Sequence, residues 1–196
     1  RAKALARSMR TTKETVGSNV VNRAFNTAYL GGDGKALCVT DHPTDAGNQS
    51  NRLAVDADLS EASLEDMIIQ IMNATDAKGL RIRLMPRKLV VPSNLTFEAT
   101  RIVVSSLQND TANNAINAIK SKGVLPDGVM TWQYLTDTDA WFVKTDAPDG
   151  MKLYNRRALS FAKDNDFNTA NALAKATERY SFGWSDWRGL YGTQGA

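Results

Sequence analysis

The sequence has little of what metal, disulfide and membrane sites require. Its 196 residues include one cysteine, Cys38, and one histidine, His42. A single cysteine excludes a disulfide within the chain, and a single histidine excludes a histidine-rich zinc site. No apolar run approaches the ~20 residues of a membrane-spanning helix. We therefore expect no metal, no cofactor and no membrane partner.

The rest of the composition is that of an ordinary globular chain. Hydrophobic residues make up 42% of it and charged residues 23%, values typical of a folded domain. A chain of this length buries roughly 70% of its unfolded surface, which is enough for a core without covalent support. One or two compact units are expected.

The net charge of +3 is unevenly distributed. By segment it is +5 for residues 1–30, −6 for 31–80, +4 for 81–101, −3 for 102–150 and +3 for 151–196. A nucleic-acid-binding domain typically gathers its basic residues into one stripe. Two interpretations of the alternation remain: solvated faces, or complementary patches that meet between neighbouring copies and fix their register.

Apolar residues at helical spacing predict three helices. The first spans residues 3–29 and ends at a glycine-rich segment. The second begins at a cap, Asp58 or Ser60, and stops at Gly79. The third follows Pro92.

Period-two alternation and short apolar runs predict strands, mostly in the second half of the chain. They span residues 80–84, 89–91, 129–134, 140–144, 152–157, 159–163 and 176–187. Helices come first and strands afterwards, an order that predicts an α+β fold.

Two motifs suggest chemistry, and each has a simpler interpretation. Residues 31–36 resemble a phosphate-binding loop but lack its first glycine and the Ser or Thr after Lys35, so we interpret them as a helix end. Cys38 and His42 suggest a nucleophile with its base, yet both lie on one polar loop without an orienting scaffold. A small hydrolase using this pair is the alternative from another class.

Two acidic pairs resemble metal ligands. Asp137 and Asp139 lie between two predicted strands, and Asp164 and Asp166 follow another, positions where aspartate favours turns. We predict turns at both places. With no persuasive active site, we predict that the chain is not an enzyme.

Aromatic and basic side chains gather near the end of the chain. Alternation over residues 180–184 places three aromatics on one face of a strand. Three interpretations remain: a sheet packed on the first helix, a contact surface, or stacking on single-stranded nucleic acid. The cluster comprises Tyr180, Phe182, Trp184, Trp187 and Tyr191, with Arg179 directly before it and Arg188 within it.

Several motifs follow one another in an order that is similar to a known family. The most distinctive are ERYSFGW at residues 178–184, with Lys175-Ala176 before it, and PRKLVVP at residues 86–92. Others lie at residues 4–10, 13–16, 22–25, 32–37, 41–43, 135–142 and 164–167. In order and spacing, the chain resembles the C-terminal two-thirds of tailed-bacteriophage major capsid proteins of the Mu-like major head subunit group.

The resemblance implies the tailed-phage major capsid protein fold, with a long spine helix and peripheral and axial domains. It implies a spine helix of the peripheral domain in residues 1–30, an axial domain in 31–150, and return strands of the peripheral domain in 151–196. The family has an N-terminal arm and an extended hairpin loop before the spine helix, and neither lies within the 196 residues of this sequence.

The resemblance also implies a structural function. Many copies would form an icosahedral shell, the virion head, around packaged double-stranded DNA, assembled in the cytoplasm of a bacterial host with portal or decoration proteins as partners. The alternative is an encapsulin-like nanocompartment, whose shell holds an enzyme cargo. A third possibility from the residues alone is a monomeric nucleic-acid-binding module.

The resemblance and the charge pattern together give candidate site residues. The candidates for subunit interface or packing are Arg156, Arg157, Arg179, Tyr180, Phe182, Trp184 and Trp187. The candidates for facing DNA are the bases that open the chain: Arg1, Lys3, Arg7 and Arg10.

Overall fold

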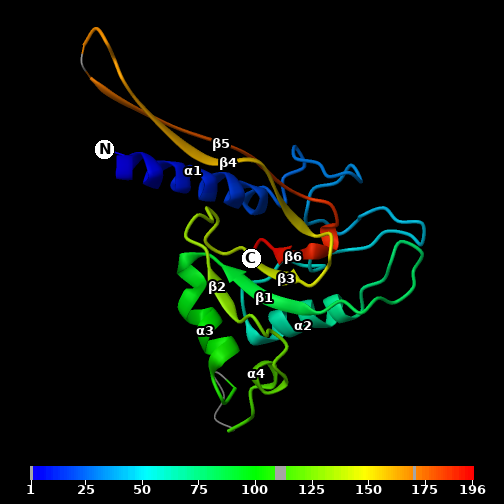
Figure 1. The fold of residues 1–196 in the computed structure, drawn as a ribbon. Helices are drawn as coiled ribbons and strands as arrows, with labels where there is room; N and C mark the ends of the chain where they lie inside the picture. Colours follow the sequence, from blue (N-terminus) through cyan, green and yellow to red (C-terminus); the bar gives the residue numbers. More distant parts are fainter. Residues whose placement is uncertain (1, 109–113, 170) are drawn as a thin grey trace.

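The computed structural model describes residues 2–108, 114–169 and 171–196. Helices and strands are mixed, as the order of elements in the sequence predicts (Figure 1). The α-helices are α1 (Ala2–Asn22), α2 (Glu61–Met72), α3 (Thr96–Val104) and α4 (Ala118–Lys122). Two short 3-10 turns are η1 (Ser93–Leu95) and η2 (Trp187–Gly189).

A four-stranded sheet lies at the centre of the molecule, in the order β2-β1-β3-β6. Its strands are β1 (Pro86–Val91), β2 (Val129–Thr131), β3 (Trp141–Thr145) and β6 (Leu190–Thr193). Strand β1 pairs with β2 in parallel, whereas the other pairings are antiparallel. Leu89, Val91, Trp141 and Val143 are fully buried in this sheet, which confirms the strands predicted at 89–91 and 140–144.

A long two-stranded hairpin forms the second sheet and runs along α1 and past its N-terminal end (Figure 1). Its strands are β4 (Met151–Asn165) and β5 (Ala172–Trp184), paired from Met151 opposite Trp184 to Asn165 opposite Ala172. The two strands predicted at 152–157 and 159–163 are one continuous strand. Only local register shifts on either side of Arg157 interrupt the ladder.

Helix α1 is shorter than predicted. Its 21 residues span about 32 Å at 1.5 Å per residue, and the helix ends at Asn22 rather than at residue 29. The Asn22 side chain donates to the carbonyl of Tyr134 (3.0 Å) and accepts from the amide of Thr136 (3.1 Å). Asn26 then accepts from the amide of Ala28 in a local turn. These hydrogen bonds turn the backbone out of the helix at Asn22, although apolar residues continue at helical spacing as far as residue 29.

Helix α2 begins as predicted and ends early. Ser60 caps it in a capping box with Ser63. The inward stripe of apolar side chains is buried: Leu64, Met67, Ile68 and Ile71. The helix stops at Met72, because the chain enters a turn in which Asp76 accepts from two main-chain amides. Gly79 (φ 84°) completes that turn instead of ending the helix.

The strand predicted at residues 80–84 is wrong. This segment makes only an isolated bridge between Thr75 and Arg81, and Leu80 is 66% exposed. Alternating side chains are not sufficient for a strand, because the backbone also needs a neighbouring strand to pair with.

The end of the chain also differs from the prediction. Strand β5 stops at Trp184, so the predicted strand at 176–187 begins four residues too late and ends three residues too late. The chain then turns through η2 and adds β6 to the edge of the central sheet beside β3. No pattern in the sequence indicated β6.

Candidate assembly surface

The hairpin packs on α1 through a glycine in the middle of the helix. A Cβ atom at Gly17 would lie 3.2 Å from the ring of Phe182, closer than most side chains pack, so a larger residue would require the ring to shift by a few tenths of an ångström. Glycine weakens a helix by up to ~1 kcal/mol relative to alanine, and here it makes room for the strand. Of the three interpretations of the aromatic cluster, the structure supports the sheet packed on the first helix.

Polar and aromatic contacts hold the same two elements together. Lys13 of α1 forms an ion pair with Glu178 of β5, whose side chain is nearly buried. The Lys13 ammonium also lies 5.1 Å from the ring centroid of Tyr180. Tyr180 in turn meets Phe182 edge to face, with ring centroids 5.5 Å apart. Tyr180 and Phe182 therefore hold the hairpin on the helix within one subunit.

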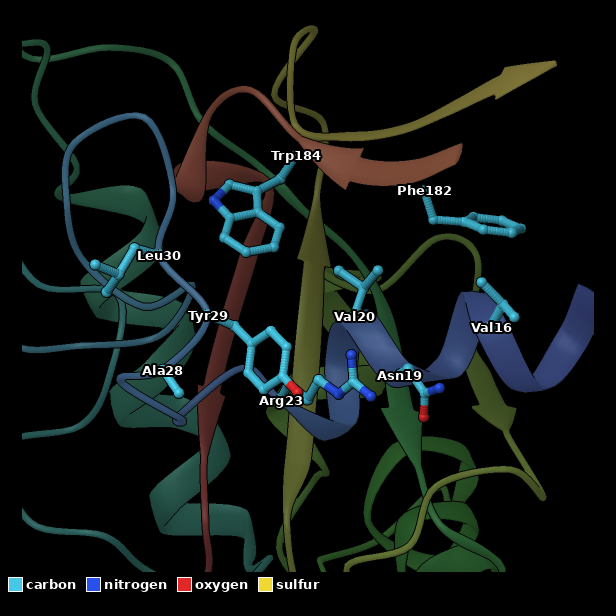
Figure 2. Close-up of a pocket in the computed structure, with 9 residues that line it drawn as sticks. All are labelled: Val16, Asn19, Val20, Arg23, Ala28, Tyr29, Leu30, Phe182 and Trp184. Carbon is cyan, nitrogen blue, oxygen red and sulfur yellow. The ribbon is translucent and has the colours of Figure 1, made fainter. Parts of the chain in front are cut away.

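A cleft of about 500 Å³ lies beside this contact, between α1, the loop that follows it and the base of β5 (Figure 2). Val16 and Val20 line it from the helix, and Phe182 and Trp184 from the strand. Tyr29 and the neighbouring Leu30 line it from the loop and are both exposed. The cleft therefore leaves apolar side chains open at the surface.

The arginine candidates form an exposed cationic patch on the hairpin. Arg157 of β4 lies directly opposite Arg179 of β5, and Arg156 is the neighbour of Arg157. All three are exposed, and none takes part in an ion pair among the described residues. Like charges directly opposite each other destabilise a strand pair. The subunit therefore carries an electrostatic cost here that an anionic partner would relieve.

Trp187 lies apart from the other aromatic candidates. It is buried and stacks on His42, with ring centroids 4.2 Å apart and an interplanar angle of 3°. The Arg188 guanidinium lies 4.3 Å from the centroid of the Trp187 ring. Of the two roles predicted for Trp187, interface or packing, this environment corresponds to packing.

The basic candidates on α1 share one face of the helix. Lys3, Arg7 and Arg10 are spaced i, i+4, i+7, a spacing that aligns side chains on one side, and all three are exposed. Among the residues that the structure describes, none of the three forms an ion pair. Arg1, the fourth candidate, lies outside the described residues.

The cysteine and histidine candidates lie in the interior. Cys38 is fully buried, and this burial raises the pKa of its thiol, which disfavours the nucleophilic thiolate. His42 is also fully buried, with Nδ1 2.6 Å from Asp33 and Nε2 3.1 Å from Asn51 Oδ1. Because that oxygen only accepts, Nε2 carries a proton. The hydrogen bonds of His42 link segments of the interior. Neither Cys38 nor His42 is exposed to a substrate.

The first acidic pair forms a turn, as predicted, whereas in the second pair only Asp166 does, because Asp164 belongs to strand β4 and lies opposite Leu173 of β5. Asp137 accepts from the amides of Asp139 and Ala140. Asp166 accepts from the amide of Asn168 and from a threonine hydroxyl. Within residues 2–108, 114–169 and 171–196, no three His, Cys, Asp or Glu side chains gather where a metal ion would bind.

Comparison with known proteins gives the class to which this fold belongs. The model of a family described as "Phage capsid protein" matches residues 1–193. The chain therefore belongs to this family of phage capsid proteins. A phage capsid family suggests a structural role for the chain.

A likeness to one solved structure is more distant. The crystal structure of a virus-like particle from Pyrococcus furiosus has 10% sequence identity and a TM-score of 0.46, over 72% of this chain and 55% of that chain. The present chain thus spans about half the length of that one. No curated protein matches the sequence. None of the described helices is both long and apolar enough to cross a membrane.

Proposed function

We propose that this chain is a major capsid subunit of a tailed bacteriophage, in the Mu-like major head subunit group, and that its copies form an icosahedral shell around packaged double-stranded DNA. The family match over residues 1–193 carries the proposal. The long helix α1 with a hairpin clamped along it supports the spine-helix architecture, because a rigid strut of about 32 Å suits a wall element better than a compact core.

We propose the same domain division for the subunit as the sequence predicts. Residues 1–30 and the return strands in residues 151–196 would form the peripheral domain, and residues 31–150 the axial domain. The contacts of Lys13 and Gly17 with β5 support the first grouping. The last strand, β6, pairs with β3 of the axial part, so the return segment would join the two domains at its end.

The cationic patch at Arg156, Arg157 and Arg179 would bind an acidic surface of a neighbouring copy. Residues 31–80 carry a net charge of −6 and are the part of the chain that would supply such a surface. Ionic contacts of this kind fix the register between copies and exclude wrong pairings. Trp184, at the edge of the adjoining cleft, would pack in the same interface.

Replacing Arg157 with glutamate is expected to affect the free subunit and the assembly in opposite directions. The new carboxylate would face Arg179 across the strands and stabilise the hairpin by about 0.2–1 kcal/mol. The same change would repel the acidic partner surface and lower the yield of particles. Thermal unfolding of the unassembled subunit and sedimentation of the particles measure the two effects.

The matched control is Arg83→Glu, which reverses an exposed base that lies outside residues 31–80 and far from the hairpin in sequence. We expect this variant to assemble at the wild-type yield. Wild-type assembly by Arg157→Glu would show that the patch does not lie in an interface.

The face of α1 with Lys3, Arg7 and Arg10 would lie toward the packaged genome. Three exposed cations on one helix face attract phosphates without regard to base sequence. Arg1 would extend the same charge cluster.

Electron microscopy of the purified protein tests the proposed function. We expect closed shells that protect genome-length double-stranded DNA from nuclease. Shells that enclose an enzyme cargo instead of DNA would establish the encapsulin-like alternative. A chain that sediments as a single 21.4 kDa subunit under all assembly conditions would contradict the proposal.

The DNA-facing role has its own readout in the same particles. Neutralising Lys3, Arg7 and Arg10 to glutamine is expected to reduce the salt slope of DNA binding by about 1 for each phosphate that the helix no longer neutralises. Lys120→Gln, which removes an exposed base from α4, is the control and should leave the slope unchanged. An unchanged slope in the triple variant would contradict the role of this face. Portal and decoration proteins, as further partners, would appear in purified heads as additional protein components.

A further inference from the structure

A groove between α2 and α4 is open at the surface and lined mainly by apolar side chains. It measures about 190 Å³, with Ile68 and Ile119 buried beside it and Ile69 and Met72 exposed. A cavity of about 150 Å³ in another protein is large enough to hold benzene. The groove therefore has room for one aromatic ring.

The same chain exposes an aromatic side chain that does not reach this groove. Phe97, in the first turn of α3, is 77% exposed and is not among the residues that line the groove. In Figure 1, α3 lies beside β2, whereas α2 lies beside β1. The exposed Phe97 side chain and the open groove thus lie on different elements of one molecule.

The outer faces of the two helices match in spacing and differ in charge. Glu65, Ile69 and Met72 of α2 are spaced i, i+4, i+7, which places them on one stripe. Phe97, Arg101 and Val104 of α3 have the same spacing, and all three are exposed. Each stripe has two apolar residues and one charged residue, and the charges are of opposite sign.

The charge difference extends beyond these stripes. Helix α2 contains three acidic residues and no basic residue, and Glu65 lines the groove from this side, whereas Lys122 lines it from α4. In its own subunit, Arg101 forms an ion pair with Glu98 only three residues away, and the arginine side chain is 60% exposed. Exposed pairs of this kind contribute ~0–1 kcal/mol, so Arg101 is available to a second carboxylate.

We propose that the groove between α2 and α4 receives Phe97 of a neighbouring copy, with Arg101 of that copy paired to Glu65 at the rim. The inference rests on the proposed function, because it requires copies of the chain to assemble. Because Phe97 and the groove are different surface patches, the contact is heterologous, and its repetition about an axis generates a ring. The groove would thus join adjacent subunits within one capsomer.

Engineered cysteines test this contact directly in assembled particles of the full chain. The native Cys38 is fully buried and does not compete. The double variant Phe97→Cys with Ile69→Cys is expected to give a ladder of covalent multimers on mild oxidation. Each single variant is expected to remain monomeric on a denaturing gel, because neither residue meets its own counterpart.

Two results would overturn the contact. Assembled particles of the double variant without cross-links would show that α2 and α3 of neighbours do not meet. Cross-linking of the Phe97→Cys single variant would show that α3 meets α3, a contact between like patches. If the wild-type chain forms no particles at all, the proposed function fails instead.

A charge swap tests the ionic part independently. Arg101→Glu and Glu65→Arg are each expected to lower the particle yield at least tenfold, and the double swap is expected to restore it. Arg83→Glu, an exposed base outside the stripe, is the control and should retain the wild-type yield. Loss of assembly in the double swap as severe as in the single variants would contradict the pairing of Arg101 with Glu65.

Discussion

Replacing Asn51 with alanine is expected to lower the free energy of unfolding by about 3 kcal/mol or more. The Asn51 side chain is fully buried and joins three segments of the chain. Its amide group donates to the carbonyls of Leu37 (2.7 Å), Trp187 (3.2 Å) and Leu190 (2.8 Å), and its oxygen accepts from the Val39 amide (3.0 Å) and from His42 Nε2 (3.1 Å).

The size of the effect follows from the partners that remain. Removing one side of a buried hydrogen bond leaves the other side unsatisfied, at about 1–3 kcal/mol for each group. Alanine at position 51 would leave several such groups in the interior together with a cavity. Denaturant unfolding of the unassembled subunit measures the loss.

Asn48→Ala is the matched control, since Asn48 is an exposed asparagine of the same loop. Its expected effect is within about 0.5 kcal/mol, as for most surface substitutions. If Asn51→Ala unfolds with a free energy within about 1 kcal/mol of the wild type, the buried network does not hold these segments together.

Replacing Gly189 with alanine is the second change with a large expected effect. A Cβ atom at Gly189 would lie 2.4 Å from the Cα atom of Gly150, and a Cβ atom at Gly150 would lie 2.7 Å from the Cα atom of Gly189. Both neighbours are backbone atoms, so no side chain can rotate away. We expect a loss of about 1–3 kcal/mol in the free energy of unfolding, the usual cost of overpacking, or more.

Gly183→Ala provides the comparison, because nothing lies within 4 Å of a Cβ atom at Gly183. We expect no loss of stability there, since a residue with a Cβ atom restricts the unfolded chain. Thermal unfolding of the two variants side by side gives the difference. Equal stability of the two variants would mean that the main chains at residues 150 and 189 separate without cost.

Much of the fold was predictable wherever a local pattern decides the structure. The apolar stripe at Leu64, Met67 and Ile71 predicted α2, and Ser60 predicted its start, because both signals lie within a few residues. Alternation at Tyr180 and Phe182 predicted a strand with both rings on one face. That the strand packs on the first helix was one of three interpretations, and the contact between Gly17 and Phe182 decided it.

The failed predictions share a physical cause. The apolar spacing of α1 continues past Asn22, but the bonds of Asn22 to residues 134 and 136 end the helix. Alternation at residues 80–84 predicted a strand that has no partner strand. The short β6 exists because the edge of β3 was free to pair with it. In each case the deciding partner lies far away in the sequence.

The sequence predicted which residues belong to the candidate site, but it did not predict how they are arranged in space. The arginines of the hairpin were named, but their position opposite each other depends on the register of β4 and β5. Phe97 was not singled out, because one aromatic residue in a helical pattern usually indicates a core position. Only its exposure, beside a groove that it does not fill, distinguishes it.

The sequence by itself determined the mixture of helices and strands, the alternating charge and the order of motifs that resembles a capsid subunit. These properties depend on neighbouring residues or on composition, so they can be read along the chain. Only the tertiary structure decided that His42 and Trp187 are buried against each other and that Arg157 faces Arg179. Burial of a polar group and proximity of two charges depend on which distant segments the fold brings together, and no local pattern specifies that choice.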